Sequence, residues 1–216
     1  MRLRHIPEAD KAILTHKLSI QNPENNKGQW NSIFNNENPI QIEIGMGKGK
    51  FLTRLATLNP SINYLGMERY SSVLYRALQK MDSLEEPLTN IKFICEDAMK
   101  ITDYFEKGEI DKIFLNFSDP WPKDRHAKRR LTSPVFLALY AEILESGHSI
   151  EFKTDNRLLF DYSVETINEF ADFNITAITY DLHNDEKMNQ GNVMTEYEEK
   201  FSSQGNPIYK LIATRV

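Results

Sequence analysis

Ile40-Gln41-Ile42-Glu43-Ile44-Gly45-Met46-Gly47-Lys48-Gly49 carries the strongest structural signal in the chain. Its first five residues alternate apolar and polar side chains, which predicts a strand, and the closely spaced glycines predict a tight turn after it. Apolar residues at helical spacing from Phe51 to Leu58 then predict a helix, which Asn59-Pro60 ends. A strand, a glycine turn and a helix in this order are typical of the beginning of a parallel α/β sheet.

The alternation of strand and helix continues along the chain. Parallel neighbours in a sheet need a crossover connection, so this order predicts an α/β fold with a mostly parallel sheet and helices on both faces. After residue 171, strands at 174–182 and 208–214 follow without a clear helix between them, which predicts an antiparallel hairpin at one edge of a seven-stranded sheet. The other strands are expected at 64–68, 91–95, 110–117 and 149–153, and the other helices at 71–84, 98–106, 134–146 and 157–171.

The length of 216 residues fits one domain. We expect residues 1–38 to form a loosely packed N-terminal arm and residues 39–216 to form a single α/β domain. The polar link at 183–207 is expected on the surface, where links of this length tend to be functional. No apolar run is long enough to span a bilayer, and charge interrupts the N-terminal residues before a signal-peptide core could form, so a cytoplasmic protein without membrane contact is expected. A single cysteine, Cys95, and scattered histidines predict neither a disulfide nor a metal site.

Charge is distributed unevenly along the chain. The formal net charge is -5, which by itself argues against a nucleic-acid partner, because binding a phosphate backbone depends on lysine and arginine. Residues 123–130 are a local exception, since they hold five of the 26 basic residues in eight positions. This segment, the basic run, is therefore a candidate contact for nucleic acid.

The glycine turn is a candidate cofactor site. In a doubly wound sheet the ligand binds at the carboxyl ends of the strands, and glycine lets a ligand approach main-chain atoms that a Cβ would block. The spacing G-x-G-x-G, with Glu43 two positions before Gly45 and with Gly47 at its centre, differs from the G-x-G-x-x-G that places a pyrophosphate at a helix N-terminus. S-adenosylmethionine carries an ammonium and a sulfonium and no phosphate, so an acidic surrounding suits it better.

Two further carboxylates follow successive strands. Glu68 ends the second strand, where an acidic side chain can accept hydrogen bonds from both ribose hydroxyls. Asp97, next to Ala98 after the third strand, would lie over an adenine and could meet its exocyclic amine. Each residue alone is more often a helix cap or a solvated side chain. Together, at the ends of neighbouring strands, they predict a site for an adenosine-type cofactor.

The fourth strand runs into Ser118-Asp119-Pro120-Trp121-Pro122. The two prolines fix φ and prevent a helix, so the segment is expected to be a stiff aromatic loop that could hold a planar base near the cofactor. The simpler interpretation is a proline-rich turn in which Trp121 fills a surface groove. The basic run that follows directly favours the first interpretation.

These segments resemble the signature of the tRNA (guanine-N7)-methyltransferases. The resemblance rests first on residues 116–123 followed by the basic run, and it extends in the expected order over nearly the whole chain. One departure is Asp124, which stands where a further basic residue is expected and which would weaken a phosphate contact there. The other matching segments are Glu43-Ile44-Gly45-x-Gly47-x-Gly49, Phe152-Lys153-Thr154-Asp155-Asn156 and Thr195-Glu196-Tyr197-Glu198-Glu199-Lys200-Phe201.

The resemblance implies a Rossmann-like class I methyltransferase fold, S-adenosylmethionine as cofactor and tRNA as partner. The sequence does not distinguish a monomer from a homodimer. It implies methylation of a guanosine in the tRNA variable loop, with Asp119 as the catalytic carboxylate. The implied cofactor site consists of Glu43, Gly45, Gly47, Glu68, Asp97, Ala98 and Asp119. The implied substrate contacts are Lys123, Asp155, Thr195, Glu196, Tyr197 and Glu198. The implied RNA contacts are Arg125, His126, Lys128, Arg129 and Arg130.

From the residues alone, Thr195 with Glu198 three positions later has the pattern of a helix capping box. Two alternative functions stay open at this stage: a methyltransferase with another acceptor, and a non-catalytic RNA-binding subunit with a vestigial cofactor pocket. A nicotinamide-linked oxidoreductase is disfavoured by the missing G-x-G-x-x-G.

Overall fold

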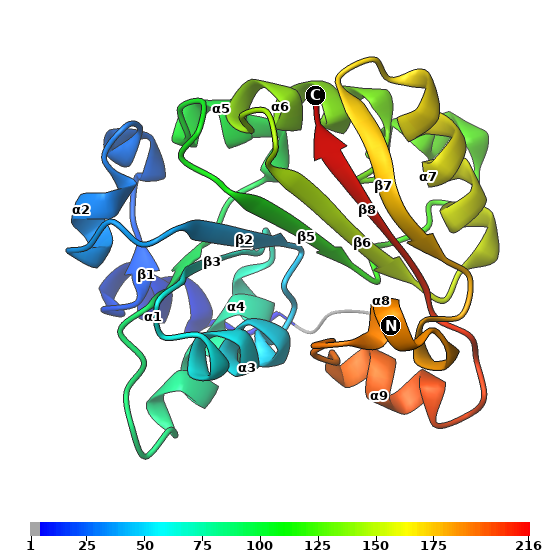
Figure 1. Ribbon diagram of the computed structural model, residues 1–216. Coiled ribbons are helices and arrows are strands. Elements are labelled where there is room, and N and C mark those ends of the chain that lie inside the picture. Colours follow the sequence, from blue (N-terminus) through cyan, green and yellow to red (C-terminus); the bar gives the residue numbers. More distant parts are fainter. Residues whose placement is uncertain (1–4) are drawn as a thin grey trace.

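An eight-stranded sheet forms the centre of the structure, a computed structural model that describes residues 5–216 (Figure 1). The strand order is β1-β4-β3-β2-β5-β6-β8-β7. The strands are β1 (Ser19–Ile20), β2 (Ile40–Ile44), β3 (Asn63–Met67), β4 (Ile91–Ile94), β5 (Lys112–Asn116), β6 (Ser149–Thr154), β7 (Phe173–Thr179) and β8 (Tyr209–Arg215).

The strand directions confirm the mostly parallel sheet with an antiparallel hairpin at one edge. All pairs from β1 to β6 are parallel, whereas β8 pairs antiparallel with both β6 and β7. β2 lies between β3 and β5. From β2 the chain adds β3 and β4 on one side, and it then crosses to add β5 and β6 on the other side, so the strand order reverses at β2. Ligands bind at such a reversal of strand order in open α/β sheets, which places the glycine turn at the expected ligand-binding edge.

Helices cover both faces of the sheet (Figure 1). Apolar side chains of α1, α3 and α4 pack on one face, and those of α5, α6 and α7 pack on the other. None of the helices within residues 5–216 combines the length and the apolar character needed to cross a membrane. The α-helices are α1 (Ala9–Thr15), α2 (Trp30–Phe34), α3 (Lys50–Leu58), α4 (Ser71–Asp82), α5 (Ile101–Tyr104), α6 (Pro134–Ile143), α7 (Arg157–Glu169), α8 (Glu186–Asn189) and α9 (Glu196–Ser202). The 3-10 helices are η1 (Pro23–Asn26), η2 (Ala98–Lys100), η3 (Asp124–Arg129) and η4 (Leu182–Asn184).

The N-terminal segment is packed more tightly than its sequence indicates. Trp30 is fully buried in the main core, where its Nε1 donates to the Tyr104 carbonyl at 2.8 Å and its ring lies 5.0 Å from that of Phe105. Residues 19–20 pair with β4 and form the eighth strand, which the expected seven did not include. The few apolar residues of this segment are separated by polar ones, so no periodicity reveals them. Residues 1–4 of the expected arm lie outside the described residues, and the domain boundary at residue 38 stays a prediction.

Gly66 in β3 leaves space for the side chains that support the glycine turn. A Cβ at this position would overlap Met46 Sδ and would come within 2.9 Å of Phe93 Cδ1 and 3.0 Å of Leu52 Cδ1. Gly66→Ala is therefore expected to lower the free energy of unfolding by about 1–3 kcal/mol, the usual cost of overpacking a core. Urea denaturation measures this loss, and an unchanged unfolding midpoint would show that the neighbouring side chains move aside freely.

Candidate active site

The glycine turn connects β2 to α3 at the ligand-binding edge of the sheet. Gly45 and Gly47 have φ values of 74° and 58°, which residues other than glycine rarely adopt. Within residues 5–216 and apart from its chain neighbours, no atom lies within 4 Å of a Cβ added at either glycine. The amides of Gly45 and Met46 donate to the Met67 carbonyl at 2.9 and 3.2 Å. The turn is thus fastened to the end of β3 and leaves open space above its glycines.

Glu68 joins this turn to the beginning of α4. Its Oε2 accepts from the Gly47 amide at 3.3 Å, and its Oε1 accepts from the Tyr70 amide at 3.0 Å. Glu68 is buried except for the part that lines a pocket, and this burial raises the pKa of its carboxyl. The two amides hold the carboxylate in a fixed orientation, so further donors could reach it only from the pocket side.

Asp97 lies at the end of the neighbouring strand β4. Its Oδ1 accepts from the Met99 amide at 2.9 Å, so it caps η2, and it lines the same pocket as Glu68. Ala98 beside it is small and buried. The sequence analysis treated helix capping and cofactor binding as alternative roles of Asp97. The structure shows that Asp97 can cap η2 and still face a ligand in the pocket.

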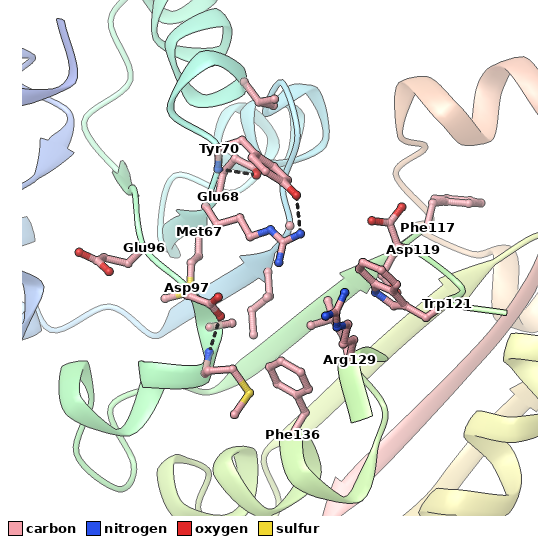
Figure 2. A pocket seen from close by; sticks show the side chains of 18 of the residues that line it. Met67, Glu68, Tyr70, Glu96, Asp97, Phe117, Asp119, Trp121, Arg129 and Phe136 are labelled. Atoms are coloured by element: carbon pink, nitrogen blue, oxygen red, sulfur yellow. Dashed lines mark hydrogen bonds between the residues drawn. The ribbon is translucent and has the colours of Figure 1, made fainter. Parts of the chain in front are cut away.

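One pocket of about 670 Å³ collects many of these residues (Figure 2). This volume lies within the range of small-molecule sites. Its walls are partly aromatic, formed by Tyr70, Phe117, Trp121 and Phe136. The residues implied by the resemblance that line it are Gly45, Glu68, Asp97, Ala98, Asp119, Lys128 and Arg129.

Asp119 lies on the loop after β5, across the pocket from Glu68 (Figure 2). Its side chain is exposed, and within residues 5–216 no group donates a hydrogen bond to it. Phe117 and Trp121 on either side have φ values of 49° and 42°. Each such conformation costs about 1–3 kcal/mol and persists only where the surroundings enforce it, which is common at functional sites.

Arg130 holds this strained loop in place. Its Nε donates to the Pro120 carbonyl and its Nη2 to the Trp121 carbonyl, each at 3.1 Å. Its guanidinium also lies 4.2 Å from the centre of the Tyr162 ring. Arg130 is therefore engaged within the protein, although the resemblance implied that it meets RNA.

The basic run forms η3 and the rim of the pocket. The Arg129 guanidinium lies 4.9 Å from the centre of the Trp121 ring, and the His126 ring approaches the same indole edge-on at 5.7 Å. Lys128 and Arg129, at the C-terminal end of η3, are exposed and line the pocket. Lys123, the N-cap of η3, and Arg125 in its first turn are also exposed but do not line the pocket. A cationic surface thus adjoins the loop that carries Asp119.

Glu43 lies beneath the glycine turn and does not line the pocket. It is 2% exposed, and Asn116 Nδ2 donates to its Oε1 at 2.8 Å. Burial raises the pKa of the Glu43 carboxyl to about 8. Glu43 Oε2 and Asn116 Oδ1 are buried acceptors without a donor in the described part of the chain. An ammonium group nearby would favour the charged form of Glu43, so these two acceptors fit a ligand that carries one.

Glu43→Gln is expected to make the protein more stable than its parent at about pH 9 but not at about pH 5. The raised pKa means that between 4.5 and about 8 the folded state binds a proton that the unfolded state does not. The parent therefore loses stability as the pH rises through this window, by up to a few kcal/mol, and the neutral glutamine does not. Thermal unfolding of both proteins across this range measures the difference, and a pH-independent difference would contradict the assignment.

A second cluster of residues implied by the resemblance, on α9 and after β6, contacts Phe117 in the pocket wall. The Tyr197 ring lies 4.9 Å from the Phe117 ring, and the Tyr197 hydroxyl donates to Asp155 Oδ2 at 3.3 Å. Thr195 caps α9, with its Oγ1 accepting from the Glu198 amide at 2.9 Å. Asp155, Thr195 and Tyr197 thus lie together beside the pocket, although none of them lines it.

The two glutamates of this cluster pair with cations of the protein itself. Glu196 lies 2.9 Å from Lys80 Nζ, and the fully buried Glu198 lies 2.7 Å from Lys153 Nζ. Glu198 therefore does not return a hydrogen bond to Thr195 as a complete capping box would. The sequence indicated Thr195 as a cap, but it gave no sign that Lys153 would bind Glu198.

Several pocket residues were not singled out from the sequence. Tyr70, Met99 and Phe136 line the pocket, but apolar residues near strand ends are common in any α/β domain. Tyr70 and Met99 each come two residues after a strand-end carboxylate, and this position is the only signal that could have marked them. Among the described residues, no three acidic, histidine or cysteine side chains gather as a metal site would require.

Comparisons with known proteins agree with this geometry. A family described as "Putative methyltransferase" matches residues 37–211. A tRNA (guanine-N(7)-)-methyltransferase of Lachnoclostridium phytofermentans is 53% identical over 215 residues, which cover 100% of this chain and 99% of that protein. The protein of the same name from Bacillus subtilis is 49% identical over 211 residues, or 97% of each chain. The chain belongs to the bacterial tRNA (guanine-N7)-methyltransferase family.

Solved structures confirm the class I methyltransferase fold of this tRNA (guanine-N7)-methyltransferase family member. A 16S rRNA (adenine(1408)-N(1))-methyltransferase from Catenulisporales acidiphilia, solved with its cosubstrate SAM, superposes with a TM-score of 0.62 over 93% of this chain and 94% of that one. The identity of 12% means that this likeness concerns the fold alone. S-adenosylmethionine is the cofactor of the family, and the carboxylates and free acceptors around the glycine turn fit its cationic groups.

Proposed function

We infer that this protein transfers the methyl group of S-adenosylmethionine to N7 of a guanosine in the variable loop of tRNA, acting as a monomer or homodimer. One observation carries the proposal. Glu68 and Asp97 line one side of a pocket, and the strained loop with Asp119 and the cationic rim of η3 lies on the other. A nucleoside cofactor and an RNA base could therefore meet between these two sides.

The cofactor side is proposed to hold S-adenosylmethionine through its polar groups. Glu68, fixed by two backbone amides, would accept from the ribose hydroxyls, and Asp97 with Ala98 would adjoin the adenine. Glu43 lies beneath the turn and does not line the pocket, so it would attract the ammonium through its charge. When bound, S-adenosylmethionine supplies an electrophilic methyl group on a sulfonium.

The acceptor side requires no general base. Guanine N7 has an in-plane lone pair and carries no proton that must leave. The protein's contribution is then to align the base with the methyl group, an effect worth up to about 7–11 kcal/mol when the geometry is close to attack. Asp119 can accept hydrogen bonds from the N1–H and the amino group of guanine, and its charge can stabilise the purine as it becomes positive.

The surroundings of Asp119 suit an extruded nucleotide. Phe117 and Trp121 offer aromatic faces, and Asp155 and Tyr197 lie behind Phe117. Variable-loop guanines take part in tertiary contacts, so extrusion would cost a few kcal/mol. The exposed Lys123, Arg125, Lys128 and Arg129 are placed to bind the adjoining phosphates.

The test is an assay with methyl-labelled S-adenosylmethionine and unmodified tRNA, followed by mapping of the labelled nucleotide. We expect 7-methylguanosine in the variable loop and no label in a tRNA whose variable-loop guanosine is replaced by adenosine. Label at another nucleotide would refute the position, and label in protein extract but not in tRNA would refute the acceptor. Calorimetry that shows no binding of S-adenosylmethionine would favour a non-catalytic RNA-binding protein.

A further inference from the structure

Lys153 is a fully buried cation near the carboxyl end of β6. It lies on β6, two residues before Asp155, and its side chain is 0% exposed. Its Nζ donates to Glu198 Oε2 at 2.7 Å, to the Val193 carbonyl at 3.0 Å and to Asn192 Oδ1 at 3.2 Å. An ammonium has three donors, so all of them are used by residues 192–198.

Glu198 is equally enclosed on the other side of this ion pair. Its Oε1 accepts from Asn192 Nδ2 at 2.8 Å and lies 3.3 Å from His183 Nε2. Its side chain is 0% exposed, so no surface of it faces the pocket or the solvent. A substrate base could touch Glu198 only if this whole set of contacts opened.

Lys153 also connects two parts of the candidate site. Its backbone carbonyl accepts from the Phe117 amide at 2.8 Å, which fixes the first residue of the strained loop. Through its side chain it fixes the beginning of α9, which carries Tyr197. Tyr197 in turn contacts both Phe117 and Asp155. Lys153 thus links the Asp119 loop to α9. Lys50, Arg54 and Lys80 tie α9 to α3 and α4, so Lys153 is the buried contact that joins α9 to the acceptor side.

We propose that the buried Lys153–Glu198 ion pair is the positioning device of the guanosine pocket, and that Glu198 holds Tyr197 in place and does not itself bind the substrate. This proposal rests on the proposed function, because it concerns the acceptor side of that site. On the cofactor side, Glu68 and Asp97 are held by the glycine turn, α4 and η2 and not by the pair, whereas Glu43 is within electrostatic range of Lys153.

The experiment compares Lys153→Met, Glu198→Gln and the double variant Lys153→Met/Glu198→Gln. The double variant leaves no unpaired buried charge, so it is expected to regain most of the stability that Lys153→Met loses. It cannot restore the hydrogen bonds to residues 192 and 193, so kcat/KM for tRNA should stay lower by on the order of 100-fold, the usual consequence of a misplaced site. The dissociation constant for S-adenosylmethionine should change much less than kcat/KM for tRNA, because Lys153 acts on the cofactor side only through its charge near Glu43.

A second buried ion pair on the same strand provides a matched control. Lys210 Nζ on β8 lies 2.9 Å from Glu151 Oε1 on β6, and Lys210 is the register partner of Lys153 in the β6–β8 pair. Within residues 5–216, no side-chain hydrogen bond or ion pair joins Lys210 or Glu151 to the Asp119 loop or to α9. Lys210→Met should therefore lower stability without lowering kcat/KM for tRNA. If Lys210→Met lowers kcat/KM as much as Lys153→Met does, the loss of activity follows from the loss of stability in general, and the proposal is wrong.

A double-mutant cycle separates positioning from direct contact. If Glu198 acts through the ion pair, the effects of Lys153→Met and Glu198→Gln on kcat/KM should be far from additive. Additive effects would mean that Glu198 binds the substrate directly, which would overturn the proposal.

Hydrogen exchange distinguishes a failure of this proposal from a failure of the proposed function. In the double variant, the amides of residues 192–203 should exchange faster than in the parent, and those of residues 43–49 should not. This readout needs no RNA, so it holds even if the parent protein does not methylate tRNA. Unchanged exchange at residues 192–203 would show that the ion pair does not hold this segment.

Discussion

Asp119→Ala is expected to abolish methyl transfer to tRNA and to leave the affinity for S-adenosylmethionine nearly unchanged. The carboxylate is exposed, lines the pocket and accepts no hydrogen bond within residues 5–216, so its loss breaks no internal contact. A charge aimed at the position where positive charge develops is typically worth about 100–1000-fold in kcat. Single-turnover rates with labelled cofactor measure the loss, and calorimetry measures cofactor binding.

Asp119→Asn is the informative control for this prediction. The amide keeps one acceptor for the guanine edge but lacks the negative charge, so its rate should lie between those of the parent and of Asp119→Ala. The melting temperature should not change in either variant, because surface substitutions away from internal contacts rarely affect stability. Full activity in Asp119→Ala would remove this residue from the mechanism.

Lys128→Ala/Arg129→Ala is expected to weaken tRNA binding by roughly tenfold for each lost phosphate contact at low salt, and to lower the salt dependence. Both side chains are exposed on the rim of the pocket, and Arg129 also lies against the Trp121 ring. The slope of log affinity against log salt should become shallower by about 0.7–0.9 per lost phosphate contact. Filter binding at several salt concentrations measures both quantities.

Lys11→Ala/Lys107→Ala removes the same charge from exposed positions on α1 and after α5, neither of which lines the pocket. This control should leave the affinity and the slope close to those of the parent. Equal weakening in both double variants would mean that only the net charge matters and that the basic run has no special position.

The sequence predicted the sheet because its strands follow simple rules. β2 to β6 alternate with helices, and each strand was found within about two residues of its expected place. The region 98–106, expected as one helix, is instead η2 followed by the short α5, since Asp97 caps a 3-10 turn before Ile101. The contribution of Trp30 to the core could not be predicted, because a single buried indole leaves no periodic pattern.

The candidate site could be predicted only in part, because some of its contacts leave no pattern in the local sequence. Strand-end positions located Glu68, Asp97 and Asp119, because the topology of a parallel sheet brings strand ends together. The ion pair of Lys153 with Glu198 joins residues 45 positions apart across a long surface link, and nothing in the local sequence encodes such a pairing. Glu43 is at a strand end as well, but it points beneath the turn and not into the pocket.

The place of β8 has a consequence for synthesis on the ribosome. β8 comes later in the sequence than every other strand, yet it lies between β6 and β7 and pairs with both. A nascent chain that already contains the pocket residues therefore still has two unpaired strand edges, which are prone to wrong association. The segment that carries α9 also leads directly into β8. The tRNA-binding side would thus be completed only after residues 209–215 have emerged and β8 has inserted between β6 and β7.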